Sequence, residues 1–198
     1  TLAHFYPKLK DRSVEFYNLG SAHLQNNEYE QAISNYTKAI EMAPNMAKAY
    51  YNRGNAYIAQ GLFDKAVLDY TKAIAINPGF TEAYYDRGLN YAMKGEYDRA
   101  IQDYNKVIEM APKMAKAYYN RGNAYITQGR YDQAILDYTK AIEINPRLGS
   151  AYHNRALAYY DEGEFDKAWQ DIHKTENLGC EIQPGFLKDL QKASGRVK

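Results

Sequence analysis

Apolar and small residues recur along the chain at the spacing of amphipathic helices. In residues 115–128 they are three, four and seven positions apart, which places them on one face of a helix. They are Tyr118, Gly122, Tyr125 and Ile126. The same spacing resumes after Gly129 and stops at Pro146, because proline disfavours helix in the residue before it. The pattern predicts two consecutive helices of about 14 residues, each roughly 21 Å long.

This two-helix stretch is a repeat unit. Residues 115–146 recur at 47–78 with six differences, and residues 81–112 keep the same skeleton. The differences are Ala59/Thr127, Leu62/Arg130, Phe63/Tyr131, Lys65/Gln133, Val67/Ile135 and Ala75/Glu143. Prolines close each unit at Pro44, Pro78, Pro112 and Pro146, and their separations (78−44, 112−78, 146−112) are all 34. Because a repeat array grows by adding units, we expect one continuous array.

Three columns of residues agree across five units that begin near residues 13, 47, 81, 115 and 149. The fourth position is aromatic: Phe16, Tyr50, Tyr84, Tyr118 and Tyr152. The eighth is small: Gly20, Gly54, Gly88, Gly122 and Ala156. The twentieth is alanine: Ala32, Ala66, Ala100, Ala134 and Ala168. Small residues let two helices cross closely, while tyrosines fill the volume between them.

This 34-residue unit resembles the tetratricopeptide repeat. The resemblance implies an all-α protein, a right-handed superhelical α-solenoid of five helix-turn-helix repeats with a C-terminal capping helix. We expect an N-terminal cap or arm at residues 1–12 and a capping helix with a frayed tail at 181–198. The repeats between them are expected at 13–46, 47–80, 81–114, 115–148 and 149–180.

Composition favours no class of charged partner. Lys and Arg number 25 and Asp and Glu 24, so the net charge of +1 gives no field that would attract nucleic acid or an anionic membrane. No apolar run approaches the roughly 18 residues of a membrane span. One cysteine, Cys180, and four scattered histidines form neither a disulfide nor a zinc pattern, so we expect no cofactor. The compartment stays open: a soluble protein, cytoplasmic, or periplasmic or exported after signal removal.

Arginine and aspartate vary together among the repeats. The seventh position carries Arg53, Arg87, Arg121 and Arg155, and the twenty-third carries Asp69, Asp103, Asp137 and Asp171. The first repeat has Leu19 and Asn35 at these positions, so both charges are lost together. We therefore predict a partly buried ion pair between the two helices of each remaining repeat. The alternative, an arginine row that binds RNA or phosphate, is weaker because paired arginines bind other anions poorly.

The resemblance also implies a concave groove lined by the first helix of each repeat. Its candidate residues are Tyr17, Asn18, Lys48, Tyr51, Asn52, Asn55, Glu82, Tyr85, Asp86, Lys116, Tyr119, Asn120, Asn123, His153 and Asn154. Asparagine offers a donor and an acceptor, so a row of them could bond the backbone of an extended peptide. Tyrosine adds contact area and a polar tip at low entropy cost. Equally, these side chains could pack or form hydrogen bonds between neighbouring repeats.

Some proteins of this family bind the acidic C-terminus of chaperones through a clamp of lysine, arginine and asparagine. The matching positions here hold Tyr17, Ser21, Asn52, Glu82 and Asp86, or, one repeat later, Tyr51, Asn55, Asp86, Lys116 and Asn120. Neither set supplies the required cations. We therefore expect no chaperone-tail binding.

The sequence favours a non-catalytic scaffold that binds a peptide or helix of a partner protein. It contains no nucleotide-binding loop and no metal-ligand pattern, so an enzyme is not expected. Single-stranded RNA binding is the alternative, since an aromatic row could stack bases, but the balanced charge speaks against it. The identity of the protein or peptide partner and any self-association stay open.

Overall fold

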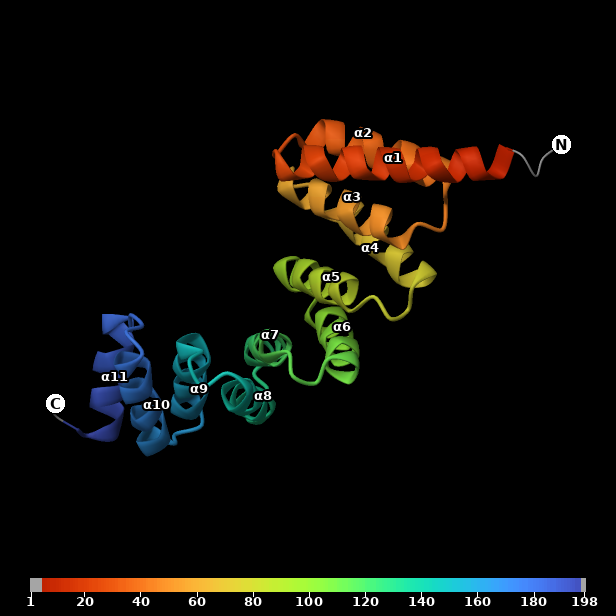
Figure 1. Cartoon of the computed structure of the whole chain (residues 1–198). Helices are drawn as coiled ribbons and strands as arrows, with labels where there is room; N and C mark the ends of the chain where they lie inside the picture. Colours follow the sequence, from red (N-terminus) through yellow and green to blue (C-terminus); the bar gives the residue numbers. More distant parts are fainter. Residues whose placement is uncertain (1–4, 197–198) are drawn as a thin grey trace. The chain divides into compact units, whose positions relative to one another are not determined.

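The computed structural model describes residues 5–196, and those residues form eleven α-helices and no strand (Figure 1). The helices are α1 (Phe5–Gln25), α2 (Tyr29–Met42), α3 (Ala47–Ala59), α4 (Phe63–Ile76), α5 (Thr81–Met93), α6 (Tyr97–Met110), α7 (Ala115–Thr127), α8 (Tyr131–Ile144), α9 (Gly149–Asp161), α10 (Phe165–Asn177) and α11 (Pro184–Ser194). The all-α repeat architecture is thereby confirmed. Residues 5–12 of the expected cap or arm continue α1 as helix, while residues 1–4 and 197–198 lie outside the described part.

The described part of the chain forms two compact units that divide after residue 90, inside α5. In the first unit α1 packs on α2, α2 on α3, and α3 on α4. In the second unit successive helices pack in the same way from α6 to α11. The first helices α3, α7 and α9 therefore each contact their own second helix and the second helix of the preceding repeat.

A left-handed residue ends the first helix of every repeat. Gly61, Gly95, Gly129 and Gly163 have φ between 69° and 76°, a region that favours glycine. In the second repeat, Gly61 N–H bonds the Ile58 carbonyl at 2.9 Å and Leu62 N–H bonds the Tyr57 carbonyl at 2.8 Å, the pattern of a Schellman cap. Asn27, with φ of 61°, takes this place in the first repeat. Asparagine tolerates this conformation, which explains the departure from glycine there.

The buried tyrosine of the second helix leaves no room for a side chain at the eighth position, which is therefore glycine. A Cβ on Gly54 would lie 2.7 Å from Tyr70 Cε1, and one on Gly122 would lie 2.7 Å from Tyr138 Cε1. The fifth repeat replaces both partners, with Ala156 facing a core that contains Ile172. The larger and the smaller side chain therefore change together, so that the volume between the two helices stays filled.

Helix α11 covers the apolar end of the fifth repeat. Its Phe186 and Leu190 are buried in one cluster with Ala156, Trp169 and Ile172. Trp169 Nε1 donates a hydrogen bond of 3.0 Å to Ser194 Oγ at the end of α11.

Gly122→Ala should destabilise the protein by about 1–2 kcal/mol. Overpacking costs about 1–3 kcal/mol, and the higher helix propensity of alanine recovers up to about 1 kcal/mol. Gly185→Ala in α11 is the control, because its Cβ would meet nothing within 4 Å and the change should stabilise. Urea unfolding measures both. The double variant Gly122→Ala with Tyr138→Ile carries the residue pair of the fifth repeat. It should lose less free energy of unfolding than the two single variants lose together. A loss equal to that sum would contradict the proposed contact between positions 122 and 138.

Candidate functional site

In each of three described ion pairs, a half-buried arginine connects three helices. Arg53 on α3 donates from Nε to Asp69 Oδ2 at 2.7 Å and from Nη2 to Asp69 Oδ1 at 2.8 Å. Its remaining nitrogen, Nη1, donates to Thr37 Oγ1 on α2 at 2.9 Å. The guanidinium also lies over the rings of Tyr50 and Tyr57, 5.6 and 5.9 Å from their centroids. One side chain thus joins its own helix pair to the preceding repeat.

The structure brings together three of the four ion pairs predicted from the sequence. Arg121 and Arg155 reach their aspartates with the same two-pronged geometry, at 2.6–2.8 Å. The Asp137 side chain is 6% exposed, so this charge is almost fully desolvated. Burial alone would lower the pKa of Arg121, but the hydrogen bonds and charge of Asp137 outweigh it and raise that pKa. These guanidinium groups are therefore charged and occupied within the fold.

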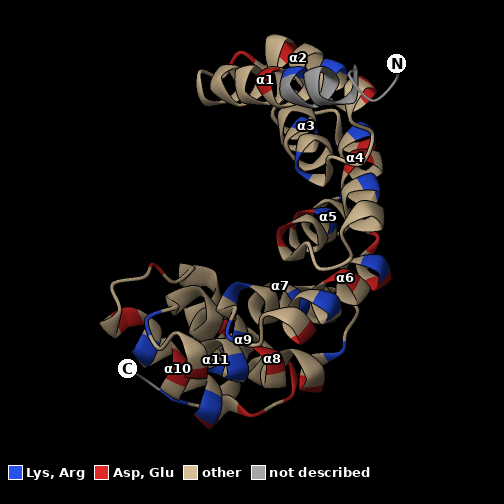
Figure 2. Cartoon of the chain, turned by 45° about the vertical axis from the view of Figure 1, so that its right-hand side comes forward, with Lys and Arg blue, Asp and Glu red and all other residues tan. Residues whose placement is uncertain are grey.

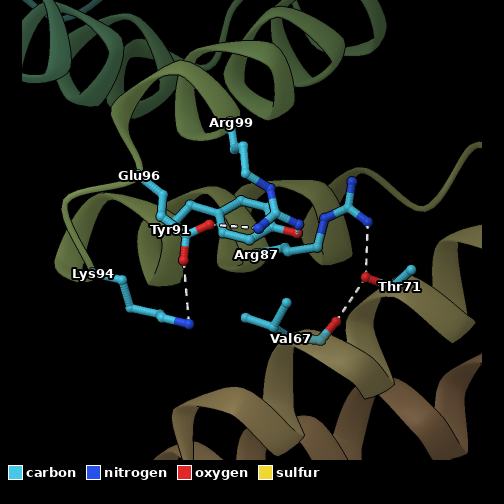
Figure 3. A network of polar contacts seen from close by, with 7 residues as sticks. All are labelled: Val67, Thr71, Arg87, Tyr91, Lys94, Glu96 and Arg99. Carbon is cyan, nitrogen blue, oxygen red and sulfur yellow. Dashed lines mark hydrogen bonds and ion pairs between the residues drawn. The ribbon is translucent and has the colours of Figure 1, made fainter.

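The fourth predicted pair stays a prediction, because Arg87 lies in the first unit and Asp103 in the second. Within the first unit, Arg87 Nη1 donates to Thr71 Oγ1 at 3.0 Å, the contact that Arg53 makes to Thr37 (Figure 3). Figure 3 also shows a polar group within the second unit, where the Arg99 guanidinium lies 3.9 Å from the Tyr91 ring centroid and pairs with Glu96.

The third arginine contact was missed from the sequence. Its acceptors occupy the twenty-fifth position of the preceding repeat: Thr37, Thr71, Asn105 and Thr139. A hydroxyl or amide recurs there wherever an arginine follows, and the fifth repeat, which no such arginine follows, has His173. That recurrence was a usable signal, because it links one repeat to the next.

Within each unit, the first helices present a surface that we call the first-helix face; it includes Tyr17, Tyr51, Asn52, Asp86, Tyr119 and Asn154. On this face, tyrosine hydroxyl groups form hydrogen bonds with side chains of the next repeat. In the first unit, Asn52 Nδ2 donates to Tyr17 Oη at 3.1 Å, and Tyr51 Oη donates to Asp86 Oδ2 at 2.7 Å. In both pairs the two residues are 35 positions apart, the fifth position of one repeat and the sixth of the next. These half-buried side chains therefore serve the packing between repeats, one of the two roles that the sequence left open.

The second unit repeats this arrangement. Asn154 Nδ2 donates to Tyr119 Oη at 3.3 Å and to Asn123 Oδ1 at 2.8 Å. The same Asn123 oxygen accepts a hydrogen bond of 2.8 Å from the buried Tyr138 hydroxyl. In the first unit, Asn55 has the same role towards Tyr70, at 2.7 Å. A connected polar network thus lies on the first-helix face of both units.

The other candidate residues differ in exposure. Asn18, Lys48, Glu82 and Lys116 are exposed, while Tyr85 and Asn120 are half-buried. His153 is half-buried, and its ring lies edge-on to Phe186 of α11, with centroids 6.1 Å apart. It is therefore close to α11 as well as on the first-helix face.

Asp86 places a half-buried negative charge on the first-helix face. Burial raises the pKa of its carboxyl, the Tyr51 hydrogen bond lowers it, and the charge of Glu82 raises it, with a net increase. Among the described residues Asp86 forms no ion pair with a cation. At the equivalent positions the first, second, fourth and fifth repeats have asparagine, so this charge distinguishes the third repeat.

Charged residues of both signs are interspersed along the helices (Figure 2). Within the described residues, no group of three or more His, Cys, Asp and Glu side chains is arranged to hold a metal ion. None of the helices in that part of the chain has the length and apolar character needed to cross a membrane.

Comparisons with known proteins identify relatives of this repeat. Tetratricopeptide repeat family models match residues 17–79, residues 115–148, and residues 69–102 and 137–170, and a TPR repeat model matches 89–129. A crystal structure of MamA is 29% identical, covers 81% of this chain and 94% of its own, and has a TM-score of 0.79. A second MamA structure is 26% identical over 95% of this chain and 97% of its own, with a TM-score of 0.81.

The structure of YrrB, described as a TPR protein with an unusual peptide-binding site, is 20% identical. The alignment covers 100% of this chain and 98% of that one, with a TM-score of 0.79, and at this identity it is evidence of fold alone. The search of curated proteins gave no match.

Asp137→Asn should destabilise the protein by about 3–5 kcal/mol, because it leaves the Arg121 charge buried without a counterion. Glu143→Gln is the control, since it removes an exposed ion pair with Lys140 and should change little. The double variant Arg121→Leu with Asp137→Asn carries the residues of the first repeat and should be more stable than Asp137→Asn alone. Thermal and urea unfolding provide the comparison. Equal loss in the single and double variants would show that the buried charge is not the cause.

Proposed function

Because the chain belongs to the tetratricopeptide repeat family, we propose that it is a non-catalytic scaffold that binds an extended peptide segment of a partner protein along its first-helix face. The observation that carries this proposal is the row of half-buried Tyr–Asn and Tyr–Asp hydrogen bonds between successive first helices in each unit. Polar groups held in place between repeats are pre-organised for a ligand, which lowers the entropy cost of binding.

The asparagines retain hydrogen-bonding capacity. Asn52 and Asn154 donate through Nδ2 to neighbouring side chains, while in the described residues no protein group donates to their Oδ1 atoms. An amide oxygen of this kind can accept a hydrogen bond from a peptide N–H. Because the bond is made to backbone, it would favour extended segments over a particular sequence.

The charged residues of the first-helix face indicate which charges the proposed ligand carries. The second and fourth repeats present the same set, Lys48, Asn52 and Asn55 matching Lys116, Asn120 and Asn123. The third repeat, between them in sequence, presents Glu82 and Asp86. We propose two similar polar, cationic sub-sites and one acidic sub-site, suited to a segment with a basic or amide-rich centre and acidic or polar flanks.

The residues of the site give little support to the two alternative functions, RNA binding and chaperone-tail binding. The arginines that an RNA-binding protein would use are occupied by aspartates in the three pairs described above. The first-helix face also lacks the cations of the chaperone-tail clamp, as its sequence indicates. YrrB, with a peptide-binding site, is an example of peptide binding on this fold.

Asn52→Ala and Asn120→Ala should each weaken binding by about 1–3 kcal/mol if their hydrogen bonds to the ligand are desolvated. The probe is a peptide with a lysine- and glutamine-rich centre and glutamate flanks, chosen from a peptide array and titrated by calorimetry. Gln102→Ala is the matched control, since it removes an exposed amide from the second-helix side. Equal affinity of all four proteins would rule out the first-helix face as the binding surface.

Binding of a peptide with a basic centre should weaken as the pH falls through the raised pKa of Asp86, because protonation removes the charge that attracts the cation. Asp86→Asn, which carries the residue of the other repeats, should bind more weakly at neutral pH and lose this pH dependence. Asp86→Lys should change which peptides bind more than it changes unfolding. Titrations over a pH series test this, and an unchanged pH profile in Asp86→Asn would contradict it.

A further inference from the structure

Helix α11 continues the repeat spacing beyond the fifth repeat. Phe186 follows Tyr152 by 34 residues (186−152), and Leu190 follows Ala156 by 34 (190−156). These are the fourth and eighth positions, and both side chains are buried against the fifth repeat. By position and packing, α11 is thus the equivalent of a first helix in a sixth repeat.

The contact between first helices is different at this end. Elsewhere a fifth-position tyrosine bonds the sixth-position residue 35 positions later, as in Tyr17–Asn52 and Tyr119–Asn154. Here the fifth position is His153, and the residue 35 positions later is Lys188. The neutral hydroxyl–amide pair is therefore replaced by two groups that can both carry positive charge.

The half-buried imidazole of His153 is partly covered by an aromatic ring of α11. Phe186 lies edge-on to it with centroids 6.1 Å apart, and Phe186 in turn lies edge-on to Tyr160, with centroids 5.6 Å apart. His153 Nδ1 is buried and has no hydrogen-bond partner among the described residues. Burial lowers the pKa of His153, so the neutral ring is favoured while α11 is docked.

Among the described residues, no acidic side chain offsets the effect of burial on the pKa of His153. The elements around His153 carry, among other titratable groups, Tyr119 of α7, Tyr138 of α8, Tyr152, Arg155, Tyr159 and Tyr160 of α9, Asp171 of α10, Cys180 and Glu181 before α11, and Lys188 and Asp189 of α11. Asp171 is bound by Arg155 at 2.7 Å, and Glu181 and Asp189 are exposed. An imidazolium at this half-buried place would lose part of its hydration without gaining a counterion.

We propose that α11 is a pH-sensitive latch on the fifth repeat, held closed by neutral His153 and loosened when His153 is protonated. The neutral ring packs on Phe186, whereas the charged ring favours the hydrated state in which α11 has left. Docking is strongest above the ordinary histidine pKa of about 6.5 and weakens as the pH falls below it. Release uncovers the apolar end formed by Ala156, Trp169 and Ile172.

Hydrogen–deuterium exchange of the full chain at about pH 7.5 and about pH 5.5 tests the latch, after correction for intrinsic rates. Peptides from α11 report docking, and peptides from α7 and α8 are the internal reference. In the wild type, the protection of α11 should fall several-fold at the lower pH relative to the reference. His153→Gln should remove this difference, and so should His153→Tyr, which restores the residue of the other repeats.

His173→Gln is the matched control. His173 is exposed and stacks on Trp169 with centroids 5.7 Å apart, so it would perturb tryptophan fluorescence without any release of α11. This variant should keep the pH dependence of α11 exchange. The latch is overturned by equal relative protection at both pH values in the wild type, by a pH dependence that survives in both His153 variants, or by its loss in His173→Gln.

Discussion

The repeat packing depends on a half-buried arginine that donates three hydrogen bonds to two neighbouring helices. In the second repeat, Asp69 takes two of the guanidinium nitrogens and Thr37 of the preceding repeat takes the third. Because a buried charge without partners is costly, the arrangement that satisfies all three is strongly favoured over any shifted packing. The ion pair therefore specifies both the pairing of helices within a repeat and the spacing to the repeat before it.

The first-helix face follows from that specified packing. Once successive first helices are held at a fixed spacing, a tyrosine reaches the amide or carboxylate one repeat later, as Tyr51 reaches Asp86. The same side chains then act in packing and in the proposed recognition, so a polar row can be both structural and functional. Among the described residues, this polar contact is absent at the last repeat. There the next helix is α11, and His153 packs on the aromatic ring of Phe186.

Much of the fold could be predicted because repetition supplies internal comparison within one sequence. The helices, the small residue at position eight and the joint loss of arginine and aspartate in Leu19 and Asn35 all depend on comparing copies at one position. The roles of Asn52 and His153 could not be decided in this way, since each depends on a side chain about one repeat away. Covariation between position seven and position twenty-five of the preceding repeat would have revealed the contact to Thr37.

The proposed binding surface is the first-helix face. NMR signals of asparagine side-chain amides report on this face, because Asn52 and Asn154 lie on it. Asn45, which lies in an exposed turn, is the reference. During titration with a peptide selected on an array, we expect saturable shifts of the Asn52 and Asn154 amides while the Asn45 amide stays unchanged. Saturable binding that leaves the Asn52 and Asn154 amides unshifted would show that the peptide binds another surface.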